Sequence, residues 1–394
     1  MTLLFYRYGS ICEPDVIAGF EELGFQVNTI TDEMTDKSIT GEQQITLIDE
    51  TLQRNTYQFV FTINFFPAIS EICNIYHIPY LCLVVDSPVL ELFSDSITNP
   101  WNRIFLFDRA LYDEFVLRNP NCIFHLPLAT NVKRWDSLIA DTPADMHQKF
   151  SSELSFIGSL YTEKCPYDDL NLPSTFISGY IEGLLAAQAK VYGYFFLEEA
   201  LPKQMVDDIV LSSPGFYTFP ERSRKDYRAV LAQYYLGTKI TSMERTELLS
   251  ALGEKYSVDL YSGSDASLLP VTLKGRVRTH TEMPLVFHNS SLNLNFTAKS
   301  IRSGIPQRVW DVLGCHGFLI SNYQTEIPEL LTPGEDLILY SSREELLELV
   351  SYYLAHPKAR TEMAENGYRK VKAYHTYPTR LTQMLELAFS LKEG

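Results

Sequence analysis

The stretch KSIRSGIPQRVWDVLGCHGFLISNYQTEIPEL, residues 299–330, carries the most structural information in this chain. Its pattern predicts a glycine turn, a short amphipathic helix, a glycine break, a buried strand and a polar loop, in that order. A glycine turn before a helix directs the unpaired N–H groups of the helix start toward one point. A phosphate group fits such a point, so the segment predicts an anion site.

Two charged residues of the predicted helix refine this prediction. Arg308 lies in the first turn, and Asp311 follows on nearly the same face. A cation near a helix N-terminus is repelled by the positive end of the helix dipole. An anion bound between the helix start and Arg308 would account for an arginine at this position. A carboxylate one turn further can accept hydrogen bonds from two hydroxyl groups of a ribose. We therefore predict that the segment from Gly304 through Ile305 to Asp311 binds a nucleoside diphosphate; the alternative is an ordinary helix start with a surface Arg-Asp pair.

The first 130 residues alternate between strand and helix patterns. The strands are apolar at nearly every position, as expected where helices cover both faces of a parallel sheet. This part of the chain therefore predicts a doubly wound α/β domain. The predicted strands are Leu3–Tyr8, Gln26–Ile30, Phe59–Asn64, Tyr80–Val85, Arg103–Phe107 and Cys122–Leu126, and the predicted helices are Pro14–Leu23, Glu42–Arg54, Ala68–Tyr76 and Leu111–Leu117.

A second α/β pattern begins near Leu154, is interrupted by a helical insertion at about 165–250, and resumes afterwards. The predicted strands there are 154–157, 258–263, 292–297, 317–321 and 337–341, followed by helices at 343–356, 357–374 and 378–391. We expect two Rossmann-like domains facing each other across a cleft, at residues 1–150 and 151–375. The last helix, at about 376–394, is expected to pack back on the first domain.

Composition narrows the classes of function. The net charge is −16, from 33 basic and 49 acidic residues, and no Lys/Arg cluster is present, which argues against nucleic acid as a partner. The six cysteines lack metal-site spacing, and Cys73, Cys82 and Cys122 lie in apolar runs typical of buried thiols. No apolar run reaches the roughly 18 residues of a membrane span. We expect a cytoplasmic protein without a metal or a bound cofactor.

At this point the sequence resembles the GT-B glycosyltransferases of the spore-maturation (CgeB-like) group. The resemblance rests on the order and spacing of several segments. They are VVDSP (84–88), LPLAT (126–130), LSFIGSLY (154–161), LNLNFT (292–297), SGIPQRVWDVLGCHGFLISNY (303–323) and EIPELLTPGEDLILYSSREELLELVSYYL (326–354).

The resemblance implies that the C-terminal domain holds a nucleotide sugar, UDP-linked in our expectation, and that an acceptor hydroxyl approaches from the N-terminal domain. It implies transfer of a hexose or N-acetylhexosamine without a metal, to a protein, a glycan or a small molecule. Many GT-B enzymes carry two acidic residues, eight positions apart, in the segment that corresponds to the glycine turn and the helix start. Asp311 occupies the second position, where the family's carboxylate holds the ribose, whereas the first position is Ser303.

Further candidates follow from the same resemblance and from local chemistry. Gly158 and Ser159 are placed at the diphosphate, or else form a simple tight turn. Lys274 and Arg278 belong to the most basic short run of the chain, and either offsets the diphosphate charge or belongs to a solvated edge strand. His280 is expected near the base, or in a structural role.

Four other polar residues lie on predicted strands or at their ends. Asn295 either lines the cleft or holds neighbouring loops, because asparagine is a poor strand former and its presence requires a reason. Asp86 is the candidate general base for the acceptor hydroxyl, with an Asx-turn or helix cap as the alternative. Asn64 and Asp108 are weaker candidates of the same kind.

Two other classes of function remain open from the sequence. One is a non-catalytic GT-B module that only binds a nucleotide or a glycan, and the missing acidic residue at Ser303 favours it. The other is a dinucleotide-dependent oxidoreductase. No GxGxxG motif follows a predicted strand, which argues against the oxidoreductase.

Overall fold

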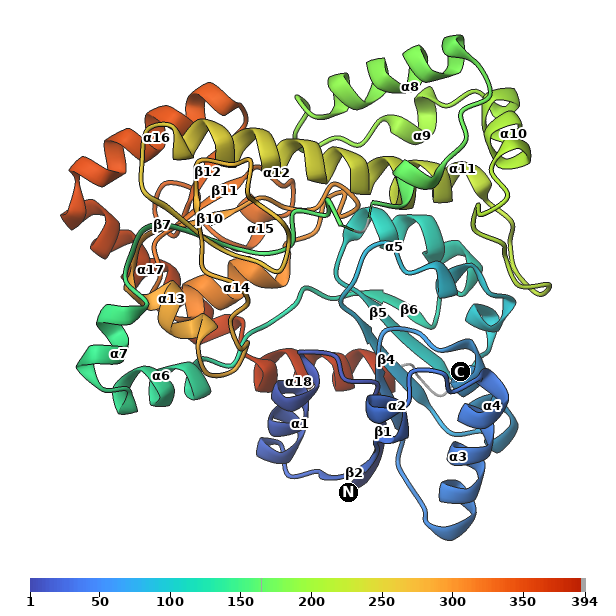
Figure 1. Ribbon diagram of the computed structural model, residues 1–394. Coiled ribbons are helices and arrows are strands. Elements are labelled where there is room, and N and C mark those ends of the chain that lie inside the picture. Colours follow the sequence, from blue (N-terminus) through green and yellow to red (C-terminus); the bar gives the residue numbers. More distant parts are fainter. Residues whose placement is uncertain (164, 391–394) are drawn as a thin grey trace. The chain divides into compact units, whose positions relative to one another are not determined.

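The computed structural model describes residues 1–163 and 165–390 and divides the chain into two compact units. Unit 1 consists of residues 1–129, 219–225 and 375–390, and unit 2 contains the other described residues up to Tyr374. Each unit contains one six-stranded sheet in which all paired strands are parallel (Figure 1). The predicted α/β class with two Rossmann-like domains is confirmed.

The sheet of unit 1 has the strand order β2-β1-β3-β4-β5-β6. Its strands are β1 (Thr2–Tyr6), β2 (Gln26–Ile30), β3 (Val60–Ile63), β4 (Tyr80–Val84), β5 (Asn102–Leu106) and β6 (Ile123–His125). Its helices are α1 (Glu13–Glu22), α2 (Asp32–Thr35), α3 (Gly41–Arg54), α4 (Pro67–Tyr76), α5 (Arg109–Phe115) and α18 (Tyr377–Phe389), with 3-10 turns η1 (Leu90–Phe93), η2 (Asp95–Thr98) and η3 (Val116–Arg118).

The sheet of unit 2 has the order β12-β11-β10-β7-β8-β9. Its strands are β7 (Ser152–Ile157), β8 (Val258–Tyr261), β9 (Thr272–Leu273), β10 (Ser290–Asn295), β11 (Leu319–Asn322) and β12 (Ile338–Tyr340). Its helical elements are α6 (Val132–Asp141), α7 (Ala144–Lys149), η4 (Pro166–Asp169), α8 (Thr175–Gln188), α9 (Leu197–Ala200), α10 (Lys203–Ser212), α11 (Tyr227–Ala229), the π-helix η5 (Val230–Leu236), α12 (Gly237–Gly253), α13 (Met283–Asn289), α14 (Gln307–Gly314), α15 (Ile327–Leu330), α16 (Arg343–Ala355) and α17 (Pro357–Tyr374).

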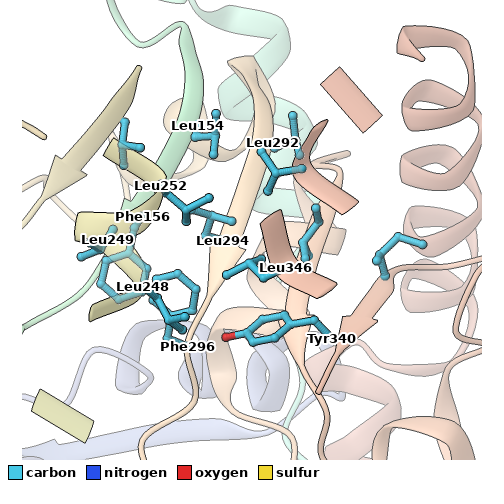
Figure 2. Packing of buried hydrophobic residues seen from close by; sticks show 14 of the residues in the cluster. Leu154, Phe156, Leu248, Leu249, Leu252, Leu292, Leu294, Phe296, Tyr340 and Leu346 are labelled. Atoms are coloured by element: carbon cyan, nitrogen blue, oxygen red, sulfur yellow. The ribbon is translucent and has the colours of Figure 1, made fainter. Parts of the chain in front are cut away.

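One hydrophobic core of unit 2 lies between its sheet and the helices α12 and α16. Figure 2 shows side chains of β7, of β10 and of Phe296 just after β10 meeting those of α12, such as Phe156 of β7 and Leu248 of α12. The rings of Phe156 and Phe296 stack with centroids 4.9 Å apart. Burying a leucine or phenylalanine of this kind contributes about 1.5–3 kcal/mol to the free energy of unfolding. The core thereby fixes the ends of β7 and β10 relative to α12.

The boundary between the units differs from the predicted one. Residues 130–149, which include α6 and α7, belong to unit 2, because Thr130 donates to Asp311 (2.8 Å) and Tyr368 donates to Asp136 (2.7 Å). Residues 219–225, predicted inside the helical insertion, belong to unit 1, where the Arg224 guanidinium lies 4.9 Å from the ring of Phe93.

The last helix, α18, packs on α1 in unit 1. Gly19 permits this close approach, since a Cβ there would lie 2.8 Å from Leu381 Cδ1. Residue 391, the end of that predicted helix, lies outside the described residues. Cys73, Cys82 and Cys122 are buried, as predicted.

Candidate functional site

The strand order of unit 2 reverses between β7 and β10. From β7 the chain proceeds to β8 and β9 on one side, and from β10 to β11 and β12 on the other. Ligands of doubly wound folds bind beyond the carboxyl ends of the strands at such a topological switch point. Gly158 and Ser159 follow β7 at this point, and Phe296 follows β10.

Arg245 of α12 joins these two strand ends. Its Nη1 donates to the carbonyl oxygen of Ser159 (2.6 Å), and its Nη2 donates to that of Phe296 (2.6 Å). A Cβ on Gly158 would lie 3.5 Å from Nη1, an ordinary van der Waals contact, so Gly158 lies directly beside the guanidinium. The Ser159 hydroxyl donates to Glu163 (3.2 Å). A buried cation therefore stands at the switch point, held by neutral carbonyl groups.

Arg308 of α14 is a second arginine near the same point. It is half-buried, its Nη1 donates to the sulfur of Met283, and its guanidinium lies 5.0 Å from the ring of Phe287. Burial lowers the pKa of Arg308; Asp311 acts in the opposite direction, and the positive charge of Arg245 lowers this pKa further. Burial also lowers the pKa of Arg245. Neither arginine forms an ion pair with a carboxylate among the described residues.

The turn before α14 is held by side chains of the neighbouring loop. Gly304 and Ile305 are buried. Gln324, after β11, donates from Nε2 to the carbonyl oxygens of Ile301 (3.0 Å) and Gly304 (3.3 Å). Ser303 Oγ donates to Oε1 of the buried Glu326 (2.7 Å). Position 303 is a serine where many GT-B enzymes have an acidic residue. The Glu326 carboxylate lies beside this serine and comes from the loop after β11.

Asp311, the predicted ribose ligand, is buried and holds two elements of unit 2 together. Its side chain is 6% exposed, and Oδ1 accepts from Thr130 Oγ1 (2.8 Å) and from Gln307 Nε2 (2.9 Å). Trp135 Nε1 donates to the same hydroxyl of Thr130 (2.8 Å). These contacts make Asp311 the link between α14 and the start of α6.

His280 joins the same group of residues. Its ring stacks on Trp135 with centroids 6.2 Å apart, and its Nδ1 lies 3.3 Å from Nη1 of Arg134. The two other basic candidates of this loop are paired with acidic neighbours: Lys274 Nζ lies 3.4 Å from Asp259, and Arg278 donates to Glu282 (3.0 Å). The structure therefore brings His280 toward Asp311 and leaves Lys274 and Arg278 in local ion pairs.

Asn295 has the contacts of a residue that holds loops. Its Nδ2 donates to Thr297 Oγ1 (3.0 Å) and to Ser321 Oγ (2.9 Å), and the side chain is buried. The side chain therefore ties the end of β10 to β11. These contacts favour the role in which Asn295 holds neighbouring loops over the role in which it lines the cleft.

Unit 1 has its own polar cluster at the carboxyl ends of β3 and β4. The exposed Asp86 accepts from Asn64 Nδ2 (2.7 Å), and Asn64 also donates to Tyr8 Oη (3.0 Å). Asn64 adopts the left-handed conformation (φ 59°), and burial and the Asp86 charge raise the pKa of Tyr8. Asp108 is a buried helix cap, because its Oδ1 accepts from the backbone N–H of Ala110 (2.9 Å).

The first turn of unit 1 is already occupied by a side chain of the protein. Glu13 Oε1 accepts from the backbone N–H groups of Tyr8, Gly9 and Ser10, at 2.9–3.0 Å. Its Oε2 pairs with Arg7 (3.0 Å). A carboxylate therefore stands where a phosphate would bind, which leaves unit 2 as the candidate nucleotide unit.

Sequence reasoning missed Arg245 and Glu326. Arg245 lies near the end of the predicted helical insertion, and Glu326 follows the last strand of the quoted segment. Local patterns give no signal for either, because both reach the site through the tertiary arrangement. Among the described residues, no cluster of His, Cys, Asp or Glu could hold a metal ion, and no helix is long and apolar enough to cross a membrane.

Residues 245–386 match the family model described as glycosyl transferase-like. No curated protein matches the chain at a significant level.

Solved structures match over the full chain at low sequence identity. The Anabaena protein HepE in complex with UDP-glucose has a TM-score of 0.55 and 11% identity, covering 99% of this chain and 100% of that one. Sucrose-phosphate synthase from Thermosynechococcus elongatus has a TM-score of 0.54 and 12% identity, covering 99% of each chain. A glycosyltransferase from Rickettsia africae has a TM-score of 0.53 and 10% identity, covering 100% and 99%. The chain thus has the fold of GT-B glycosyltransferases, and its residues 245–386 match a glycosyl transferase-like family.

Proposed function

We propose that the protein transfers a hexose or N-acetylhexosamine from a UDP-linked sugar to a hydroxyl group of an acceptor. One observation carries the proposal. Arg245 and Arg308 are two buried or half-buried guanidinium groups near the switch point of unit 2, without a carboxylate partner among the described residues. Their mutual repulsion is relieved when a multivalent anion binds between them.

A diphosphate suits this arrangement better than a monovalent anion, because it carries enough charge to offset both arginines. In the transfer step the acceptor oxygen attacks the anomeric carbon, and the bond from that carbon to the diphosphate oxygen breaks. The electron pair goes to the diphosphate, where Arg245, Arg308 and the start of α14 stabilise the added charge. These groups supply positive charge without a metal, so we expect turnover to persist in the presence of a chelator.

On the acceptor side we propose Asp86 as the group that orients or deprotonates the hydroxyl. Its carboxylate is exposed and is held by Asn64 Nδ2 (2.7 Å), as a positioned base requires. The resemblance to the CgeB-like group supports an acceptor on a protein or a surface glycan. Asp311 and His280 are proposed on the nucleoside side, through their link by Trp135 and Thr130.

The test is calorimetric titration with UDP, GDP, CDP and ADP, followed by assays of sugar release from the corresponding nucleotide sugars. We expect UDP to bind, Arg308→Ala and Asp311→Ala to weaken binding, and a UDP-hexose to be slowly hydrolysed or transferred. If UDP and GDP bind both variants as tightly as the unaltered protein, the assigned site is wrong. Tight UDP binding without hydrolysis or transfer would instead identify a non-catalytic binding module.

A further inference from the structure

Unit 2 contains a pocket at the end of its sheet that is opposite to the switch point. The pocket has a volume of about 650 Å³ and lies where β10 begins, between α6, the end of α13 and α17. β10 has six residues, so at about 3.3 Å per residue its two ends lie roughly 17 Å apart. The volume falls within the roughly 300–1,000 Å³ of small-molecule sites. Neither the sequence analysis nor the proposed transfer reaction uses this pocket.

Three polar side chains of the pocket have atoms that are open to solvent and have no hydrogen-bond partner among the described residues. These atoms are Nε2 of His288, Oγ of Ser291, and Nε and Nη2 of Arg360. None of the three side chains is paired with a carboxylate in the part of the chain that the structure describes. A ligand in the pocket can therefore form hydrogen bonds with all three.

Arg360 of α17 is a cation held from one side only. Its Nη1 donates to the carbonyl oxygen of Tyr353 and to that of Leu354 (3.0 Å), both near the end of α16. Burial lowers the pKa of Arg360, and a bound anion would offset this cost. The planar guanidinium group matches a carboxylate, because two of its N–H groups can donate to the two carboxylate oxygens.

His288 supplies an acceptor to the same pocket. Its Nδ1 lies 3.0 Å from the carbonyl oxygen of Cys315, which can only accept, so the neutral ring carries its proton on Nδ1. Burial lowers the pKa of His288, and the neighbouring rings of His316 and His147 lower it further. The ring is therefore neutral at pH 7, and its open Nε2 accepts a hydrogen bond from a hydroxyl group.

The two carboxylates that line the pocket already have cationic partners. Asp136 accepts from Lys372 Nζ (3.2 Å), and Glu365 lies 3.4 Å from Nε of Arg369. These pairs leave the single charge of Arg360 available to a ligand. One negative charge on the ligand balances it, whereas a phosphate dianion would carry an excess charge that the two nearby carboxylates repel.

We propose that this pocket binds a hydroxylated carboxylic acid of the size of a sugar acid. Its carboxylate would pair with Arg360 and accept from Ser291 Oγ, and one of its hydroxyl groups would donate to His288 Nε2. Ile139 and Phe318 in the lining supply apolar surface for its C–H groups. The site is separate from the proposed nucleotide site and does not depend on the transferase assignment.

The experiment is a saturation-transfer NMR titration with glucuronate, galacturonate and gluconate. Three comparison compounds each lack one feature: methyl glucoside has no carboxylate, acetate has no hydroxyl group, and glucose 6-phosphate has a phosphate in place of the carboxylate. We expect at least one of the three acids to bind, and to bind more tightly than every comparison compound.

Arg360→Gln should raise the dissociation constant of that acid about 10- to 150-fold, because it removes the charge from the hydrogen bonds to the carboxylate. Lys358→Gln is the matched control, since Lys358 is exposed on the same helix, lies outside the lining and loses the same charge. We expect the control to bind the acid like the unaltered protein.

A second pair of variants tests the pocket by its volume. Ala140→Trp fills the pocket from an exposed position of α6, and Ser137→Trp is its control, exposed on the same helix but outside the lining. The signal of the acid should be lost in Ala140→Trp and kept in Ser137→Trp. Saturating UDP should leave the signal unchanged.

The inference is overturned if none of the three acids binds, or if a comparison compound binds as tightly as they do. It is also overturned if Arg360→Gln or Ala140→Trp binds the acid like its control, or if UDP displaces the acid. UDP affinity measured on the same samples separates this result from the proposed function. Acid binding without UDP binding would refute the transferase site alone, and the reverse would refute the acid site alone.

Discussion

Replacing Arg308 by glutamine tests the two-arginine site most directly. Glutamine keeps a hydrogen-bond donor of similar reach and removes the charge. A hydrogen bond to a charged group is worth about 1.5–3 kcal/mol, so the dissociation constant of UDP should rise about 10- to 150-fold. Isothermal titration calorimetry at fixed ionic strength measures this change, and the UDP-induced rise in Tm should fall in parallel.

Arg302→Gln is the matched control for this variant. Arg302 lies in the loop just before α14, and its Nη1 is 3.4 Å from Glu198, whereas Arg308 has no carboxylate partner among the described residues. We expect Arg302→Gln to change UDP affinity much less than Arg308→Gln. Without ligand, Arg308→Gln should not lower Tm, because it removes a charge that repels Arg245. Equal UDP affinity in Arg308→Gln and the unaltered protein would refute the reasoning.

Three other predictions follow from the described contacts. Asp86→Asn should lower kcat for transfer by about 10²- to 10⁴-fold and leave UDP affinity unchanged, and an unaltered kcat would remove Asp86 from the mechanism. Gln324→Leu leaves the carbonyl groups of Ile301 and Gly304 without their donor. The free energy of unfolding in urea should fall by about 1–3 kcal/mol per buried carbonyl, and UDP should bind more weakly. Unchanged UDP affinity would show that the turn before α14 does not need this support. Burial lowers the pKa of His288 below its ordinary 6.5, so the unfolded state binds the proton more readily and stability is lost as the pH falls below about 6.5. The Tm of the unaltered protein minus the Tm of His288→Leu should therefore decrease from pH 7 to pH 5. A constant value would contradict the lowered pKa of His288.

The two units differ in what fills the turn after the first strand. In unit 1 the carboxylate of Glu13 accepts three backbone N–H groups of residues 8–10. In unit 2 the corresponding turn at Gly158 lies beside the guanidinium of Arg245. A negative side chain excludes a phosphate and a positive one attracts it, so similar topologies give different binding properties. This contrast supports the proposal that only unit 2 binds the nucleotide.

The sequence by itself determined the strands other than the two-residue β9, most helices and the two α/β patterns. Continuous apolar runs such as Tyr80–Val84 specify buried parallel strands whatever surrounds them, and the segment 299–330 forms the predicted turn, helix α14 and strand β11. These features depend on local patterns of apolar side chains and on glycine, which a single stretch of sequence contains.

Only the tertiary structure decided which charges remain available at the site. Lys274 and Arg278 looked like phosphate ligands but pair with Asp259 and Glu282. Arg245 gave no signal in the sequence and yet lies at the switch point. Whether a charged side chain is neutralised depends on neighbours far away in the chain, and that arrangement exists only once the helices pack on the sheet.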